Sequence, residues 1–214
     1  MTRTEAPDGA FIKVCGITRR EDALHALQHG ATALGFVFWP NSPRAITPSA
    51  AREIVAALPA ETTTVGVFVN EIPERVRDVI ATTGVTAVQL HGDEEPEAFD
   101  FLECPFLRSV TLDDLAETAR GWPPGTTWLL DASDRVRRGG TGTRIDWSRA
   151  AGVARQHKVV LAGGLTALNV ADAIHTVQPF GVDVSSGVEA SPGIKDFALM
   201  SLFLSNARRA FGRL

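Results

Sequence analysis

The sequence predicts an α/β fold, a single (β/α)8 TIM barrel, from two observations. Short runs rich in β-branched and aromatic residues recur along the chain, and a stretch with helical spacing of apolar residues follows each run. Strand–helix pairs that alternate in this way require parallel strands joined by right-handed crossovers. Eight such pairs in 214 residues match a minimal barrel. A doubly wound open sheet is the alternative, but it rarely needs eight evenly spaced strands.

Each expected strand is a short apolar run bounded by polar or turn residues. The expected strands are Phe11–Val14, Ala33–Phe38, Thr63–Val69, Ala87–Leu90, Phe106–Val110, Thr127–Leu130, Val159–Leu161 and Gly181–Val184. The clearest helices are expected at Glu21–His29, Pro48–Leu58, Pro73–Thr82 and Lys195–Phe211. Thr47 before Pro48 combines an N-cap residue with a proline at the first helical position, which supports the start of the second helix.

Composition narrows the class of protein. The chain is 44% hydrophobic and 21% charged with a net charge of −4, and no composition shift divides it, so residues 1–214 are expected to form one domain. The mildly acidic balance favours neither nucleic acid nor an anionic membrane as a partner. No stretch of 18 apolar residues and no secretory signal is visible. No obligate protein partner is evident from the sequence.

The cysteines indicate a reducing compartment. Cys15 and Cys104 are far apart and belong to no CxxC pair, which argues against a disulfide scaffold or a zinc site. Histidines and carboxylates do not cluster in the spacing of a metal site, so no metal is expected. We therefore expect a cytoplasmic protein with reduced thiols.

The barrel architecture predicts where the chemistry lies. Active sites of these barrels lie at the carboxyl ends of the strands, on the loops that lead into the helices. The polar or glycine residues at those ends are Cys15, Arg44, Asn70, His91, Asp131, Gly163, Gly164, Ser185, Ser186 and Gly187.

Cys15 ends the first expected strand, before a loop that begins with Gly16. Strand alternation places Lys13 and Cys15 on one face and Ile12 and Val14 on the other. From this segment alone, Cys15 is either a small buried core residue or a thiol placed for chemistry.

The glycines after the seventh and eighth strands predict a phosphate site. Phosphate sites in these barrels often use the two loops that follow those strands, where backbone N–H groups can approach an anion closely. Gly163-Gly164 and Ser185-Ser186-Gly187 occupy both positions. Each alone could be an ordinary turn or cap, but their joint occurrence favours phosphate.

Three further strand-end residues have open interpretations. Asp131 is a general acid or a cap for the following turn. Arg44, in a loop stiffened by Pro40 and Pro43, is a clamp for a carboxylate or a surface salt-bridge partner. His91 is a structural or a functional histidine. The Gly139–Gly142 stretch suggests a segment that closes over a ligand.

These motifs together resemble the phosphoribosylanthranilate isomerases of tryptophan biosynthesis. The resemblance spans the chain from Phe11 onward. The matching segments are Lys13–Thr18, Gly35–Phe38 with Pro40 and Ser42–Arg44, Val65–Asn70, Val88–Gly92, Leu129–Asp131, Gly140–Gly142 with Asp146–Trp147, Leu161–Leu165 and Val182–Glu189.

The resemblance implies an Amadori rearrangement that needs one acid, one base and no cofactor. The substrate is N-(5′-phosphoribosyl)anthranilate, a small phosphorylated molecule, and the product is 1-(2-carboxyphenylamino)-1-deoxyribulose 5-phosphate. By resemblance, Asp131 is the acid that protonates the furanose oxygen and Cys15, as thiolate, is the base that removes the C2′ proton. Arg44 would hold the anthranilate. The remaining expected substrate-binding residues are His91, Gly163, Gly164, Asp183, Ser185, Ser186 and Gly187.

Lys13 raises a physical question, because an unpaired lysine inside a barrel is costly to bury. Asp183 faces inward by the same alternation as Ser185 and is the partner that we expect. Such a pair would set the electrostatic surroundings of Cys15.

Three other proteins share part of this pattern. The related isomerase of histidine biosynthesis uses aspartates for both proton transfers and has two similar halves, whereas this chain has Cys15 and unlike halves. Indole-3-glycerol phosphate synthase relies on a lysine and glutamates that are not found here in that pattern. An inactive phosphosugar-binding protein would lack Cys15 or Asp131, and both are present.

Overall fold

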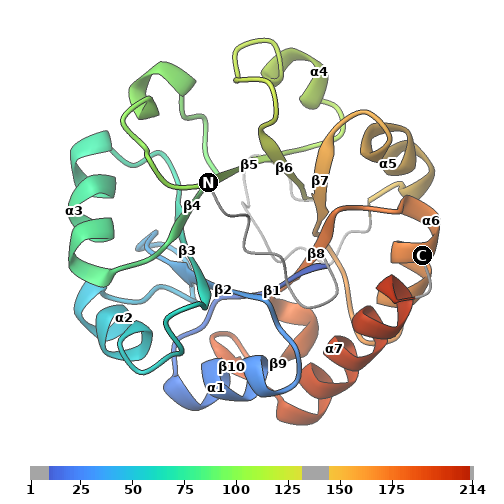
Figure 1. Ribbon diagram of the computed structural model, residues 1–214, viewed down its shortest axis with the longest axis horizontal. Coiled ribbons are helices and arrows are strands. Elements are labelled where there is room, and N and C mark those ends of the chain that lie inside the picture. The colour runs from blue at the N-terminus through green and yellow to red at the C-terminus, as the bar shows by residue number, and fades with distance from the viewer. Residues whose placement is uncertain (1–9, 132–144, 213–214) are drawn as a thin grey trace.

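Eight parallel strands close into a barrel in the computed structural model, which describes residues 10–131 and 145–212 (Figure 1). All eight expected strands are present, so the predicted (β/α)8 barrel is confirmed. The strands are β1 (Phe11–Cys15), β2 (Ala33–Val37), β3 (Thr63–Phe68), β4 (Ala87–Leu90), β5 (Phe106–Val110), β6 (Thr127–Leu130), β7 (Lys158–Leu161) and β8 (Gly181–Val184).

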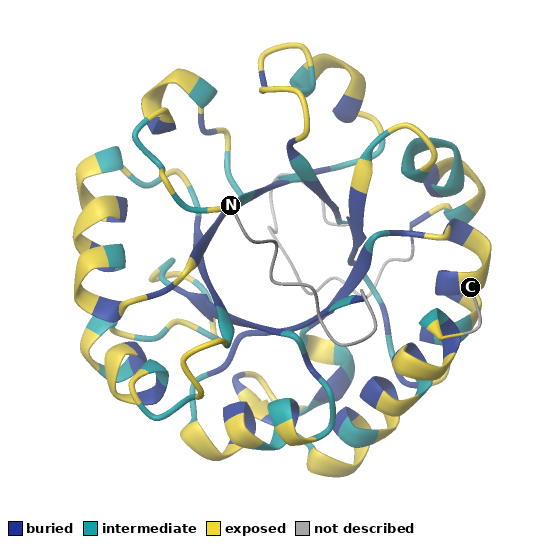
Figure 2. Ribbon diagram, viewed as in Figure 1, coloured by how far each residue is buried: buried dark blue, intermediate teal, exposed yellow. Residues whose placement is uncertain are grey.

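Helices surround the barrel as an outer ring (Figure 1). They are α1 (Arg20–Gln28), α2 (Pro48–Val55), α3 (Pro73–Thr83), α4 (Leu115–Thr118), α5 (Trp147–Ala154), α6 (Val170–Val177) and α7 (Phe197–Phe211). Thr47 caps α2 as expected, since its side chain accepts a hydrogen bond from the Ala50 N–H. Each helix combines buried residues with exposed ones, the pattern of a helix that packs one face against the barrel (Figure 2).

Two segments depart from the expected strand–helix alternation. Between β4 and β5 the chain forms only a short 3₁₀ helix, η1 (Pro96–Phe99), and α4 after β5 is a single turn. Pro96 is tolerated at the first helical position, but Pro105, directly before β5, disfavours helical backbone in the residue that precedes it and so limits how far a helix could extend. Phe99 and Leu115 still bury their side chains against the barrel and so cover this part of the sheet.

The last helix begins two residues later than expected. Residues after β8 form η2 (Ser186–Val188) and an antiparallel hairpin of β9 (Glu189–Ser191) and β10 (Ile194–Lys195) before α7 starts at Phe197. Asp196 is the reason, since its carboxylate accepts a hydrogen bond from the Leu199 N–H and so caps the helix. Lys195 thus belongs to the hairpin.

The strands bury side chains on both faces, as parallel barrels require. Outward-facing residues such as Ile12, Val14 and Phe36 join the core that the helices cover. A smaller inner cluster fills the barrel itself with Ala33, Val65, Ala87, Leu107, Leu129, Val160 and Ala162. The alternation expected for β1 is confirmed: Ile12 and Val14 face the helices, whereas Cys15 lies in an inner cluster with Val37 and Val67.

The barrel closes where β1 pairs with β8, the first strand of the chain with the last barrel strand. In this register Lys13 lies beside Asp183 and Val14 beside Val184. No helix within the described ranges is long and apolar enough to cross a membrane.

Candidate active site

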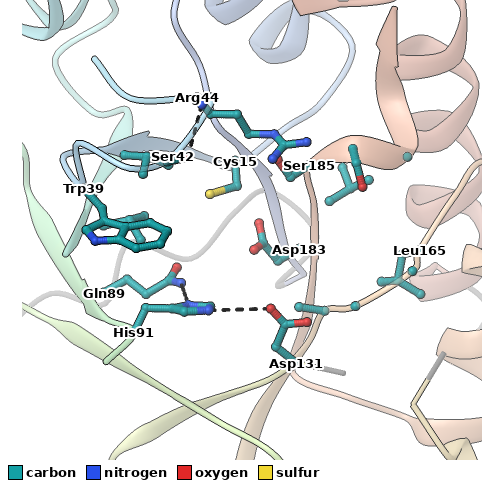
Figure 3. A pocket seen from close by; sticks show the side chains of 18 of the residues that line it. Cys15, Trp39, Ser42, Arg44, Gln89, His91, Asp131, Leu165, Asp183 and Ser185 are labelled. Carbon is teal, nitrogen blue, oxygen red and sulfur yellow. Dashed lines mark hydrogen bonds and ion pairs between the residues drawn. The ribbon is translucent and has the colours of Figure 1, made fainter. Parts of the chain in front are cut away.

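A cavity opens at the carboxyl ends of the strands, where the sequence places the site (Figure 3). All the site residues expected from the sequence line it: Cys15, Arg44, His91, Asp131, Gly163, Gly164, Asp183, Ser185, Ser186 and Gly187. Figure 3 shows Asp183 between Cys15 and Asp131, with Trp39 on the side of the cavity opposite Ser185. The Gly139–Gly142 segment, for which a closing motion is expected, lies outside the described residues.

Lys13 and Asp183 form a buried ion pair beneath Cys15. The Lys13 Nζ lies 2.9 Å from the Asp183 Oδ1, with no exposure of the lysine side chain, so the expected partnership is confirmed. The contact is close without the alignment of a good hydrogen bond. Burial alone would lower the pKa of Lys13, but the Asp183 carboxylate and the Cys15 sulfur raise it above the ordinary value. Lys13 is therefore a fixed positive charge inside the barrel.

Gly35 on β2 makes the room that these side chains need. A Cβ atom at this position would lie 2.7 Å from the Cys15 Sγ and 3.1 Å from the Lys13 Cε. Any larger residue would therefore displace the thiol or the ammonium group.

The surroundings of Cys15 act on its thiol in opposite directions. Burial raises the pKa of Cys15 above the ordinary value, and the positive charges of Lys13 and Lys195 offset only part of this effect. The thiolate is therefore a minor form at neutral pH. Proximity to Lys13 stabilises that minor form once it appears.

Asp131 directly follows β6 and faces His91 across the cavity mouth. The Asp131 Oδ2 lies 3.7 Å from the His91 Nε2, and both side chains are mostly buried. On its other side, the His91 ring meets Gln89, with 2.9 Å between the Gln89 Nε2 and the His91 Nδ1. Figure 3 shows the three side chains in one row.

The β7 and β8 loops lie backbone against backbone at one wall of the cavity. A Cβ atom on Gly187 would collide with the carbonyl oxygen of Leu165, so only glycine fits there. Gly163 and Gly164 have φ angles of 75° and 68°, in the left-handed region that favours glycine. Asn169 stabilises this loop: it donates to the Gly164 carbonyl and accepts from the Thr166 N–H.

Arg44 is paired with Glu189 at the edge of the cavity. Its Nε donates to the Glu189 Oε1 at 2.8 Å and its Nη2 to the Glu189 Oε2 at 2.7 Å, a two-pronged pair at the edge of the cavity. Glu189 thereby fixes the direction of the guanidinium group while Arg44 still lines the cavity.

Lys195 ties this pair to the ends of two strands. Its buried Nζ donates to the Glu189 Oε1 at 2.8 Å, to the Cys15 carbonyl at 2.6 Å and to the Ser185 carbonyl at 3.2 Å. All three ammonium hydrogens are thus used. Burial alone would raise the pKa of Glu189, but its hydrogen bonds and ion pairs with Arg44 and Lys195 lower it below the ordinary value.

Sequence reasoning assigned no role to Gln89, Glu189 or Lys195. Gln89 could have been found, because strand alternation points it inward two residues before His91. Lys195 could not, since the pattern that identified α7 counted it as the first residue of that helix.

Comparison with known proteins gives a consistent result. Residues 12–206 match the family model described as N-(5′-phosphoribosyl)anthranilate (PRA) isomerase. The isomerase of that name from Pseudomonas paraeruginosa is 46% identical over 206 residues, which cover 94% of this chain and 96% of that protein. The one from Hahella chejuensis is 42% identical over 207 residues, with 93% and 94% covered.

Solved structures agree. Phosphoribosylanthranilate isomerase from Thermotoga maritima superposes with a TM-score of 0.85 at 41% identity, with 94% of this chain and 99% of that chain covered. A structure of the isomerase in complex with reduced 1-(o-carboxyphenylamino)-1-deoxyribulose 5-phosphate gives a TM-score of 0.83 at 39% identity over the same shares. The chain belongs to the N-(5′-phosphoribosyl)anthranilate isomerase family.

Proposed function

We propose that this chain converts N-(5′-phosphoribosyl)anthranilate to 1-(2-carboxyphenylamino)-1-deoxyribulose 5-phosphate, an intramolecular change of an aldose into a ketose. One observation carries the proposal: Cys15 and Asp131 line the same cavity as Arg44 and two glycine-rich loops. A proton donor, a proton acceptor and anion-binding groups are what this rearrangement requires. The relative bound to the reduced product supports the substrate class.

Asp131 acts as the acid in the proposed first step. It donates a proton to the furanose oxygen, the C1′–O bond breaks, and the anthranilate nitrogen stabilises the open chain as an iminium ion. Asp131 is left as a carboxylate, with the His91 Nε2 at 3.7 Å to stabilise the new charge.

Cys15 acts as the base in the second step. Its thiolate removes the C2′ proton, and the electron pair moves to form an enolamine, which then tautomerises to the ketone. Lys13 stabilises the thiolate that begins this step. Cys15 and Asp131 return to their starting protonation states by exchange with water.

The remaining cavity residues bind the two anionic ends of the substrate. We assign the 5′-phosphate to the β7 and β8 loops, with Gly163, Gly164, Ser185, Ser186 and Gly187, because backbone N–H groups in such loops suit phosphate. Arg44, oriented by Glu189, holds the anthranilate carboxylate. Asp183 accepts hydrogen bonds from the ribosyl hydroxyls, and His91 lines the same cavity beside Asp131.

We place the reaction in the cytoplasm. Both Cys15 and Cys104 are free thiols, which suits a reducing compartment.

The decisive experiment follows the loss of substrate fluorescence with the wild type, Cys15→Ala and Asp131→Asn. Turnover should fall by at least about 100-fold in each variant, since each removes one proton-transfer group. Cys104→Ala, a half-buried thiol far from the cavity, and Asp78→Asn, on the exposed face of α3, are matched controls and should keep full activity. An inactive wild type refutes the function, and full activity in both site variants refutes the mechanism.

A further inference from the structure

Gln89 is a buried polar side chain that is hydrogen-bonded to His91. It lies inside the barrel on β4 with 2% of its surface exposed. Its amide nitrogen is 2.9 Å from the His91 Nδ1, whereas its Oε1 has no partner among the described residues. A residue kept for packing alone would be apolar, because an unpartnered polar atom costs free energy to bury. The hydrogen bond to His91 is therefore the feature to explain.

The direction of this hydrogen bond decides which nitrogen of His91 carries the proton. With the amide NH2 toward the ring, Nδ1 accepts, so a neutral imidazole carries its proton on Nε2. Turning the amide would place two N–H groups where Oε1 now lies without a partner, and orphaned buried N–H groups are rarer than orphaned carbonyls. The burial of Gln89 thus favours the Nε2–H tautomer.

That tautomer has a consequence at Asp131. The His91 Nε2 lies 3.7 Å from the Asp131 Oδ2, so in this tautomer its N–H places positive charge beside that oxygen. A protonated carboxyl group then carries its proton on the other oxygen, Oδ1. The opposite tautomer would present a bare Nε2, which would accept the acid proton and hold it away from a substrate.

We propose that Gln89 is a positioning residue that holds His91 as the Nε2–H tautomer, so that Asp131 presents its acid proton from Oδ1. The charged groups around Asp131 include Asp183 on β8 and its partner Lys13 on β1, and the hydrogen bond between Gln89 and His91 is made by neither of them. The inference rests on the proposed acid role of Asp131, and it adds a residue that acts through His91.

The first test is the ¹⁵N NMR spectrum of the imidazole nitrogens, with the His91 signals assigned from a His91→Asn variant. We expect a protonated Nε2 and a bare Nδ1 in the wild type. In Gln89→Glu the carboxylate can only accept, so the proton should move to Nδ1. A wild-type spectrum with the proton on Nδ1 overturns the proposal, and so does a Gln89→Glu spectrum identical to that of the wild type.

The second test is turnover. Gln89→Met keeps the length of the side chain and removes the hydrogen bond; we expect kcat to fall about tenfold with KM within about twofold, because the bond acts through the acid and not through substrate affinity. Gln156→Met, at an exposed position, is the control. Unchanged kcat in Gln89→Met, in protein whose circular dichroism matches the wild type, overturns the proposal.

These tests separate the inference from the function on which it rests. The spectrum reads the tautomer in the absence of substrate, so a failure of the proposed reaction would appear as an inactive wild type with its NMR result intact.

Discussion

The buried pair of Lys13 and Asp183 makes a quantitative prediction about stability. The perturbation is Asp183→Asn, which keeps the shape of the side chain and removes its charge. At the observed 2.9 Å the lost attraction is about 6 kcal/mol for an effective dielectric constant near 20. Lys13 has no exposure to water, so in the variant it must stay charged without this partner or lose its proton.

Losing the proton sets an upper limit on the cost. Deprotonating a lysine of ordinary pKa at pH 7 costs about 4.6 kcal/mol, close to the 3–5 kcal/mol typical of a broken buried pair. Without Asp183, burial lowers the pKa of Lys13 in the folded protein below its pKa in the unfolded chain. The loss of folding stability is therefore largest at pH values below the folded-state pKa, and it shrinks as pH rises toward the unfolded-state pKa. At pH 9 the same limit is about 1.9 kcal/mol.

The assay is urea unfolding followed by tryptophan fluorescence at pH 7 and pH 9. It is best done in a Cys15→Ala background, because a Cys15 thiolate could replace Asp183 as the anion beside Lys13. Adding Lys13→Met to Asp183→Asn should restore much of the lost stability, since no uncompensated charge then stays buried. A loss below about 1 kcal/mol at pH 7, or a loss that does not change with pH, would refute the reasoning.

Three further predictions concern the site. Gly35→Ala should destabilise the fold by about 1–3 kcal/mol and reduce kcat, because its methyl group meets the Cys15 sulfur; a melting curve like that of the wild type would contradict this. Glu189→Gln should raise KM about tenfold, because Arg44 loses the partner that orients it. In urea unfolding the variant should be less stable than the wild type above the ordinary glutamate pKa, and the difference should vanish as pH falls through the lowered pKa of Glu189. The raised pKa of Cys15 predicts that the rate of its alkylation by iodoacetamide still increases at pH values above the pKa of an ordinary cysteine, where an ordinary thiol already reacts at its maximal rate. Cys15→Ala serves as the blank.

Local patterns in the sequence predicted the barrel because parallel strands buried on both faces read as short apolar runs. The topology rule then placed Cys15, Asp131 and the glycines of the β7 and β8 loops at one mouth. Alternation placed both Lys13 and Asp183 on inward faces and so predicted that they pair, and the register of β1 with β8 brings them together. That residues 1–214 form one domain stays a prediction.

What the sequence could not predict depends on long-range geometry. Lys195 reaches the Cys15 carbonyl only because the β9–β10 hairpin lies beside the carboxyl end of β1, a contact across 180 residues. Arg44 meets Glu189 for the same reason. The segment after β4 has a composition that resembles that of a helix but forms only one 3₁₀ turn, because Pro105 disfavours helical backbone directly before β5.

The pairing of β1 with β8, here called the seam, closes the barrel, so the site forms only when the whole barrel has folded. Cys15 comes from the first strand, and its neighbours Asp183, Ser185 and Lys195 come from the last sixth of the chain. A nascent chain therefore holds an unmatched Lys13 until the end of synthesis, which opposes early closure of a shorter barrel. Isomerase activity in a fragment-complementation experiment would accordingly measure closure of this seam, and a chain permuted to begin between β4 and β5 would make the seam a local contact.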